Sequence, residues 1–259
     1  MAANLLAVNV GNTRTQLGTF AEGKLVFNRA IANQDIDHAD FADVLREAMT
    51  PLAEVADAAV LIATVNESVS DRVAALIEST LNVKPKYVER DMTIPIGRQL
   101  DRESIVGDDR LLNAAAAYNT VKQACVIVDA GTAVTVDFVD GAGTFHGGAI
   151  GPGAQMMLRA MKEGTAQLPE VEWRRPIEPI GHNTAEAMRS AVFHGIRGMV
   201  RELVERYAEV NGMYPIVICT GGGAALLFED YDLIERIVPD LTLQGIATTF
   251  QAHLESLSD

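Results

Sequence analysis

One strand–turn–strand pattern occurs twice in the chain, and this repeat decides the fold that the sequence predicts. The first copy is "LLAVNVGNTRTQLGTF" (Leu5–Phe20), and the second begins "CVIVDAGTAVTVDFVDG" (Cys125–Gly141). Each copy has an apolar run, a turn with glycine and threonine, and a second strand-like run. Asn9–Thr15 aligns with Asp129–Thr135 at a constant offset, which indicates an internal duplication.

Strands and helices alternate around both copies. The first copy predicts strands Asn4–Val10, Thr15–Phe20 and Leu25–Ile31, then helix Phe41–Met49, strand Ala58–Thr64 and helix Ser70–Leu81 with Ser70 as its cap. An irregular connection, Tyr87–Val106, precedes a helix over Asp108–Lys122, and after the second copy we expect a helix from about Asn183 to Val210 and a last helix from about Ile246 to Leu257. The prediction is an α/β protein with domains 1–118 and 119–259.

The composition excludes several classes of protein. Of the 259 residues, 48% are hydrophobic and 22% charged, which is typical of an ordinary globular protein. A net charge of −14 argues against nucleic acid as a partner, and the apolar runs are too short to cross a membrane, so we expect a cytoplasmic protein. Cys125 and Cys219 lie in apolar runs and are expected to be buried thiols, and the five histidines lack zinc-ligand spacing.

The repeated turns suggest phosphate binding, because glycine turns offer backbone N–H groups with little bulk in the way. A single copy would be explained as a plain hairpin turn. Two copies together with a third glycine loop, Thr220–Gly223, predict a phosphate-binding cleft between the two halves. The third loop follows a strand and opens a helix, so close strand–helix packing is its alternative explanation.

Two acidic sites stand beside these turns. In "GDDR" (Gly107–Arg110), Asp109 is a candidate general base and Arg110 a partner for a substrate carboxylate, although Asp108 or Asp109 could instead cap the helix. Asp129 ends an apolar strand, where a carboxylate is costly unless it binds a ligand, a cation or turn amides. A cation next to a triphosphate would satisfy it.

In the long helix, one apolar stripe comprises Met188, Val192, Ile196, Met199 and Leu203, with Gly195 and Gly198 nearby. Burial in the core is the default interpretation of such a stripe. A dimer seam is the alternative, and the sequence does not separate the two.

The motifs "NVGNTRT", "GDDR", "DAGTAVT", "GGAIGPG", "GHNTAEA" and "TGGGA", in this order, resemble those of type III pantothenate kinases over nearly the whole chain. The resemblance implies duplicated ribonuclease-H-like halves of the actin-like ATPase superfamily, with ATP held in a central interdomain cleft. It also implies phosphorylation of pantothenate, the first step of coenzyme A biosynthesis, by a homodimer that needs Mg²⁺ and a monovalent cation, K⁺ or NH₄⁺.

The resemblance assigns roles to individual positions. Asp109 resembles the catalytic base, Gly107–Arg110 the pantothenate loop, with Arg110 suited to the carboxylate, and Thr184 a further pantothenate contact. Asp129 resembles the ligand of the monovalent cation. The implied ATP contacts are Asn9, Gly11, Asn12, Thr13 and Arg14 in the first turn, Gly131 and Thr132 in the second, and Gly221, Gly222 and Gly223 in the adenosine loop.

Two positions depart from the family pattern. The family's first turn normally begins with Asp, where this chain has Asn9, although its internal counterpart is Asp129. Asn keeps the shape but removes a charge close to Mg²⁺ and phosphate, so metal binding should weaken. Leu100 replaces an aromatic residue seven positions before Gly107, which alters one wall of the expected pantothenate pocket.

Three functions follow in order of preference. The first is an ATP-dependent pantothenate kinase in which Asp109 activates the hydroxyl. The second is a non-catalytic nucleotide- or pantothenate-binding protein, since Asn9 is a change that spares binding while it harms transfer. The third is a subunit of an actin-like polymer.

Overall fold

The computed structural model describes residues 3–55 and 58–257, which form two compact units. The first unit comprises Met1–Ile96, Arg102–Asn119 and Leu241–Asp259, and the second comprises Gly97–Asp101 and Thr120–Asp240. The expected boundary at 118/119 lies beside the crossing at 119/120. The chain returns to the first unit at Leu241. The expected division into two continuous domains does not include this return.

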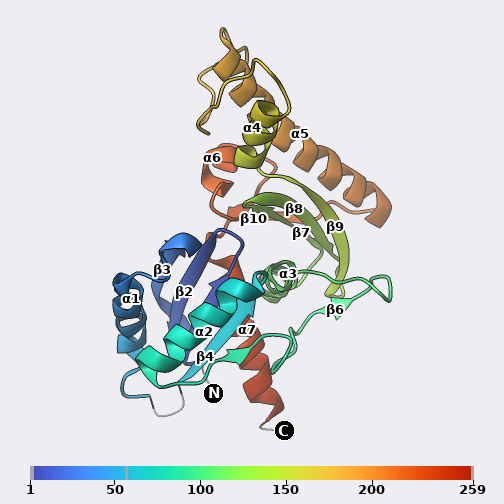
Figure 1. The fold of residues 1–259 in the computed structure, drawn as a ribbon. Helices are drawn as coiled ribbons and strands as arrows, with labels where there is room; N and C mark the ends of the chain where they lie inside the picture. Colours follow the sequence, from blue (N-terminus) through green and yellow to red (C-terminus); the bar gives the residue numbers. More distant parts are fainter. Residues whose placement is uncertain (1–2, 56–57, 258–259) are drawn as a thin grey trace. The chain divides into compact units, whose positions relative to one another are not determined.

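The first unit is built on a five-stranded sheet with the order β3-β2-β1-β4-β5 (Figure 1). β1 pairs antiparallel with β2 and parallel with β4. Apolar residues bury β1 on both faces, as expected of a central strand covered on both sides. The strands are β1 (Leu5–Val10), β2 (Arg14–Ala21), β3 (Lys24–Ala32), β4 (Ala59–Thr64) and β5 (Lys86–Tyr87).

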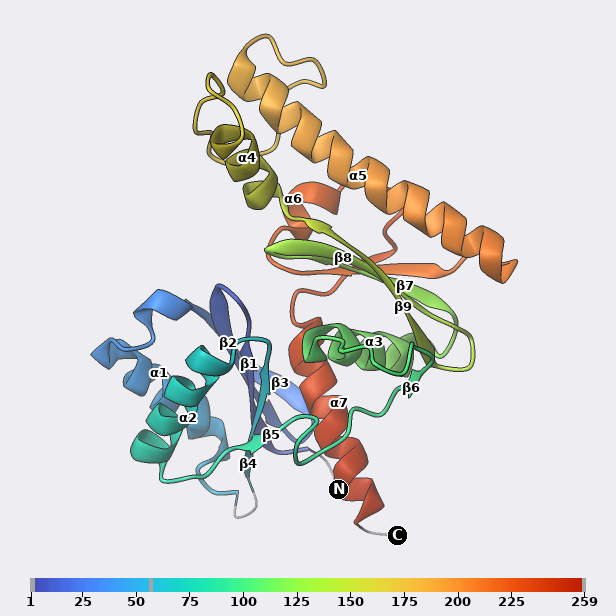
Figure 2. The same cartoon turned by 45° about the vertical axis from the view of Figure 1, so that its right-hand side comes forward.

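Helices cover both faces of this sheet, and Figure 2 shows α1 and α2 on one side with α3 and α7 on the other. The core under α1 and α2 combines alternate β1 residues such as Leu6 and Val8 with Phe41 and Val73 from the helices. The helices are α1 (Ala39–Met49), α2 (Glu67–Leu81), α3 (Asp108–Val121) and α7 (Leu241–Ser256), with short 3₁₀ turns η1 (Asn33–Asp35) and η2 (Thr50–Leu52).

The second unit repeats this plan with the sheet order β11-β10-β7-β8-β9-β6. Its strands are β6 (Gly97–Arg98), β7 (Cys125–Ala130), β8 (Ala133–Val139), β9 (Thr144–Pro152), β10 (Ile216–Thr220) and β11 (Arg236–Ile237). β9-β8-β7-β10-β11 matches β3-β2-β1-β4-β5 in order and in strand direction. The predicted fold class, a duplicated ribonuclease-H-like α/β architecture, is confirmed in each unit.

Three helices cover one face of the second sheet: α4 (Ala154–Glu163), α5 (Thr184–Asn211) and α6 (Ala224–Phe228). The predicted stripe of α5 is buried at Met188, Val192 and Ile196 and continues through Val200 and Val204. Met199 and Leu203 pack at the margin of the same core. The stripe therefore supports core packing, as the default interpretation expected.

The two copies align at one constant offset in sequence, but in the structure their turns differ in length. Asn9 pairs with Gln16 across the first turn, whereas Asp129 pairs with Thr135 across the second, so the first turn is one residue longer. The constant offset predicted for Asn9–Thr15 is therefore wrong beyond the turn. Thr13 and Thr132 occupy equivalent places in the two turns. The Thr13 carbonyl accepts a hydrogen bond from the N–H of Asn33, the first residue after β3, and the Thr132 carbonyl accepts one from the N–H of Gly153, the first residue after β9.

Two helix starts also differ from the prediction. α2 begins at Glu67 with Asn66 as its cap, whose side-chain oxygen accepts from the Val69 N–H, while Ser70 lies buried inside the helix. α7 begins at Leu241, several residues before the expected Ile246. No helix in the described part of the chain is long and apolar enough to cross a bilayer.

Candidate active site

The first glycine turn connects β1 to β2 and is closed by its own backbone. The Gly11 N–H donates to the Arg14 carbonyl at 3.0 Å, and a β-carbon at Gly11 would lie 3.1 Å from the same oxygen. The side chains of Asn12, Thr13 and Arg14 are exposed. The turn thus offers backbone and short polar groups to a ligand, as the sequence predicts for a phosphate turn.

Asn9 lies half-buried near the end of β1, beside the turn. Its strand neighbours are Gln16 on β2 and Ala63 on β4. None of these three side chains carries a charge. A divalent cation at this position would meet an amide oxygen where Asp129 supplies a carboxylate in the second unit.

Asp109 lies in the first turn of α3, behind a close backbone turn. Its Oδ1 accepts the Arg110 backbone N–H at 2.8 Å, and that N–H also points at the Gly107 carbonyl at 3.1 Å. A β-carbon at Gly107 would lie 2.7 Å from Asp109 Oδ1, so only glycine leaves this carboxylate in place. The capping interpretation and the catalytic one are compatible, because one oxygen satisfies a helix amide while Oδ2 remains for another partner.

Burial raises the pKa of the Asp109 carboxyl above its ordinary value. The Arg110 N–H bond and the positive charge of Arg110 oppose this rise but do not cancel it. A carboxylate with a raised pKa is a stronger base than an ordinary aspartate, which suits proton abstraction from a hydroxyl.

The second glycine turn brings Asp129, Gly131 and Gly221 together at the ends of the parallel strands β7 and β10. Thr220 lies beside Asp129 in the strand register. A β-carbon at Gly131 would lie 3.4 Å from Asp129 Oδ1, and one at Gly221 would overlap the same oxygen. The negative charge of Asp129 also contributes, after burial, to a raised pKa of the neighbouring Cys219 thiol.

The loop Gly221–Gly223 is held against the end of β7. Gly221 has a φ of +93°, which favours glycine, and the Gly223 N–H donates to the Ala130 carbonyl at 2.8 Å. The alternative of close strand–helix packing is therefore part of the explanation. The loop still exposes Gly222, so the same glycines leave backbone open to a ligand.

Thr184 is the first residue of α5 and is exposed. The cap of this helix is Asn183, whose Oδ1 accepts the Glu186 N–H at 2.9 Å. α5 begins at the end of the second unit that is distant from its sheet (Figure 2). Within this unit, the fold brings Asp129, Gly131 and Gly221 together.

Leu100 belongs to the segment that joins the second unit's sheet through β6. A β-carbon at Gly147 on β9 would lie 3.4 Å from Leu100 Cδ2. The side chain is half-buried in this position.

The described residues contain no group of three or more His, Cys, Asp or Glu side chains that could hold a metal ion by itself. Among the turn residues predicted for the site, Asp129 is the one that carries a carboxylate.

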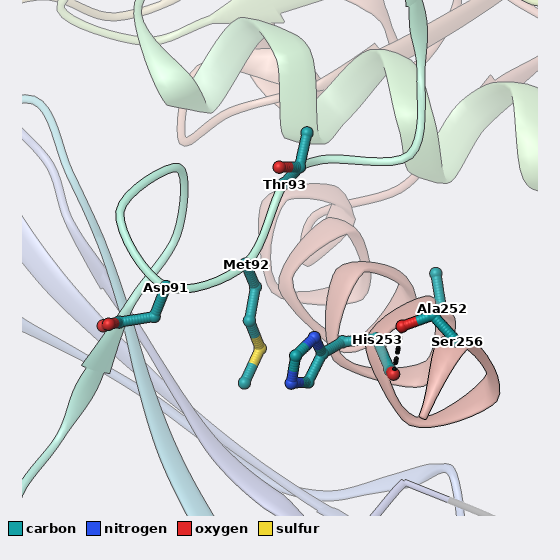
Figure 3. Close-up of a pocket in the computed structure, with 6 residues that line it drawn as sticks. All are labelled: Asp91, Met92, Thr93, Ala252, His253 and Ser256. Carbon is teal, nitrogen blue, oxygen red and sulfur yellow. Dashed lines mark hydrogen bonds between the residues drawn. The ribbon is translucent and has the colours of Figure 1, made fainter. Parts of the chain in front are cut away.

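A separate pocket in the first unit lies between the segment 91–93 and the end of α7, with Met92 turned toward His253 (Figure 3). Its lining comprises Asp91, Met92, Thr93, Ala252, His253 and Ser256. The residues predicted for the site are all elsewhere in the chain, so this pocket is distinct from the candidate active site.

Asn33 is a residue in contact with the first turn that the sequence interpretation did not consider. It follows β3 and hydrogen-bonds to the first turn through its side chain and its backbone. The available signal was the repeat itself, because Asn33 stands at the same offset from Gly153 as Asn9 does from Asp129.

Comparison with known proteins gives a consistent result over the whole chain. A family model described as type III pantothenate kinase matches residues 5–206. A protein named type III pantothenate kinase from Dehalococcoides mccartyi is 34% identical, covering 98% of this chain and 99% of the relative. One of the same name from Rhodospirillum rubrum is 37% identical, covering 93% and 96%.

A solved structure shows the same fold. A conserved Baf family protein from Campylobacter jejuni superimposes with a TM-score of 0.63 at 17% identity, covering 96% of this chain and 99% of that one. At this identity the likeness concerns the fold alone.

Proposed function

The chain belongs to the type III pantothenate kinase family, and from this premise we propose that it transfers the γ-phosphoryl group of ATP to the primary hydroxyl of pantothenate. This is the reaction that the names of its relatives describe, and it opens coenzyme A biosynthesis. The enzyme is then a phosphotransferase that acts on an alcohol group.

The observation that carries the proposal is the placement of Asp109. Its carboxylate is partly buried, has a raised pKa and lies at a helix start whose glycine leaves room for it. Phosphoryl transfer to an alcohol requires a group that orients the hydroxyl and accepts its proton. Asp109 has the chemistry and the protonation behaviour for this task.

Binding of the two substrates is assigned to the remaining residues. The turns at Gly11–Arg14 and Gly131–Thr132 and the loop Gly221–Gly223 bind ATP through backbone N–H groups. Arg110 pairs with the carboxylate of pantothenate, alongside Gly107 and Asp108. Thr184 is proposed as a further pantothenate contact.

Two cations complete the proposed site. Asp129 would hold a monovalent cation, K⁺ or NH₄⁺, beside the second turn, and Mg²⁺ would supply positive charge that neutralises the phosphates. The amide of Asn9 in place of a carboxylate is expected to weaken the hold on Mg²⁺.

A second candidate function rests on Asn9 alone. A protein that keeps the turns but has lost a charge near the metal could bind nucleotide or pantothenate without transfer. A regulatory binding protein is then the alternative to the kinase.

Steady-state phosphorylation of pantothenate with ATP, Mg²⁺ and K⁺ separates these functions, with Asn9→Asp and Asp109→Asn measured in parallel. The kinase proposal expects turnover by the wild type, loss in Asp109→Asn, and a lower Mg²⁺ requirement in Asn9→Asp. Turnover by Asn9→Asp but not by the wild type would instead establish the binding protein. Absence of turnover in both, with no ATP binding, would remove the proposal.

The assembly and location are proposed on separate grounds. Gly195 and Gly198 lie exposed on α5, where a β-carbon would meet nothing within 4 Å, which supports this face as a contact in a homodimer. Cys125 and Cys219 are buried free thiols, and burial raises the pKa of Cys125 to about 12, which supports a reducing, cytoplasmic environment.

A further inference from the structure

Asn33 connects the end of β3 to the first glycine turn through three hydrogen bonds. Its Nδ2 donates to the Gly11 carbonyl at 2.9 Å, and its Oδ1 accepts from Thr15 Oγ1 at 3.0 Å. Its backbone N–H donates to the Thr13 carbonyl at 3.0 Å. With a relative exposure of 8%, Asn33 is a buried polar residue whose amide is satisfied on both sides by the turn and its flank.

In the second unit, the equivalent contact with the turn is made by backbone alone. Gly153 occupies the position of Asn33, and its N–H donates to the Thr132 carbonyl at 3.1 Å. A β-carbon at Gly153 would lie 2.5 Å from both the Gly131 and the Thr132 carbonyl oxygens, so backbone packs directly on the shorter turn. The longer first turn leaves room for a side chain, and the amide of Asn33 fills it.

The bond from Asn33 to the Gly11 carbonyl has a directional consequence. A trans peptide group is planar, and its C=O and N–H point in opposite directions. The Gly11 carbonyl and the Asn12 N–H belong to one peptide group, so holding the carbonyl toward Asn33 directs the Asn12 N–H to the opposite side. The Asn12 and Thr13 side chains, which flank this N–H in the chain, are exposed.

We propose that Asn33 is a positioning residue for phosphoryl transfer, which fixes the Gly11–Asn12 peptide group so that its N–H faces a phosphate of the bound nucleotide. The inference rests on the proposed function, because it takes the first turn as a phosphate turn. Asn33 touches no reacting atom and acts through the turn. A charged or flexible residue at this position would leave the peptide group free to rotate.

The test compares Asn33→Ala with Asn28→Ala, which is a matched control. Asn28 lies on β3, the strand that Asn33 follows, and its Oδ1 accepts from Gln16 Nε2 at 3.0 Å, but this pair is exposed. We expect Asn33→Ala to raise the Kd for ATP, measured by calorimetry, and the KM for ATP by about tenfold or more. The KM for pantothenate should stay unchanged, and Asn28→Ala should match the wild type in every constant.

A second readout needs no nucleotide. Hydrogen exchange of peptides covering residues 5–20 should accelerate at the turn amides in Asn33→Ala and remain unchanged in Asn28→Ala. If Asn33→Ala does not fold, Thr15→Val replaces it, because this change removes only the hydroxyl that donates to Asn33. Its effects are expected in the same direction but smaller.

The outcomes distinguish this inference from the proposed function. ATP binding by the wild type, with the same Kd and the same exchange in Asn33→Ala, would overturn the positioning role and leave the kinase proposal intact. A loss of equal size in the KM values for both substrates would also overturn it, because that result indicates general destabilisation. No ATP binding by the wild type would overturn both.

Discussion

Gly221 packs directly on the Asp129 carboxylate: a β-carbon at Gly221 would overlap Asp129 Oδ1 and lie 2.7 Å from the Ala130 carbonyl oxygen. Gly221 directly follows β10, Asp129 is the second-last residue of the neighbouring parallel strand β7, and the glycine also has a φ of +93°. The position of Asp129 therefore depends on the absence of a side chain at Gly221.

Gly221→Ala should lower the free energy of unfolding by about 2–4 kcal/mol, because left-handed strain and a steric overlap act together. Gly212→Ala is the control, since Gly212 has a φ of +68° but open space around it, and only the strain of about 1 kcal/mol applies. Urea denaturation of both variants measures the difference. Equal losses would show that the overlap with Asp129 is relieved without cost.

Asp109→Asn should lower kcat by about 10²–10⁴-fold, because the variant keeps the acceptor for the Arg110 N–H but cannot take a proton. In the wild type, the acidic limb of kcat/KM for pantothenate should lie above the pH range of an ordinary aspartate, since burial raises the pKa of Asp109. A pH profile between about 4 and 9 checks this. An acidic limb at the pKa of a free aspartate would contradict it.

The same substitution has a predicted effect on stability. A carboxyl whose pKa rises on folding contributes stability below its unfolded pKa of about 3.9, and this contribution is lost as the pH rises through the folded value. Asp109→Asn should therefore become more stable relative to the wild type between acidic and neutral pH. Thermal melts of both proteins over this range would contradict the prediction if their difference stayed constant.

The two cap candidates of α2 should respond in opposite ways. Asn66→Ala removes the oxygen that accepts the Val69 N–H and should cost about 1 kcal/mol of unfolding free energy. Ser70→Ala should be neutral or stabilising, because Ser70 Oγ is buried without a hydrogen-bond partner in the described structure. Denaturation curves would contradict this assignment if Ser70→Ala were the more damaging change.

Gly195→Ala tests the exposed face of α5. If the face is open to solvent, alanine should stabilise the helix by up to about 1 kcal/mol. If it is the dimer contact proposed above, the added methyl group should weaken association, which sedimentation velocity would detect. Gly141→Ala, at a loop position that is equally open, serves as the control for a glycine change without a helix.

Most of the fold could be predicted because the relevant signals are local. Apolar alternation and turn residues defined β1, β2, β7 and β8, and the repeated turn revealed the duplication. The true cap of α2 could also have been found from local signals. Val69 belongs to the buried face of the helix and precedes Ser70, so the helix has to begin before Ser70. The apolar periodicity should therefore have selected Asn66.

What could not be predicted depends on contacts between distant residues. The two turns align in letters at one offset, yet hydrogen-bonded pairing shifts the second strand by one residue. Asn33 has partners 18 and 22 residues away, so its one sequence signal is its place in the repeat opposite Gly153, and nothing beside it in sequence marks its role. The site around Asp109 could be predicted, because all of the contacts described between Gly107, Asp109 and Arg110 lie within four consecutive residues.

The packing of α7 in the first unit sets an order of events during synthesis. Leu243, Ile246 and Phe250 are buried, and Gly245 lies so close to Leu112 of α3 that a β-carbon would overlap its backbone. A ribosome delivers β1, β2 and β4 early, but α7, which packs on all three of these strands, is the last described element to emerge. The sheet of the first unit therefore stays partly exposed after the whole sequence of the second unit has been synthesised. The unit whose translation begins first is the one that can complete its folding last.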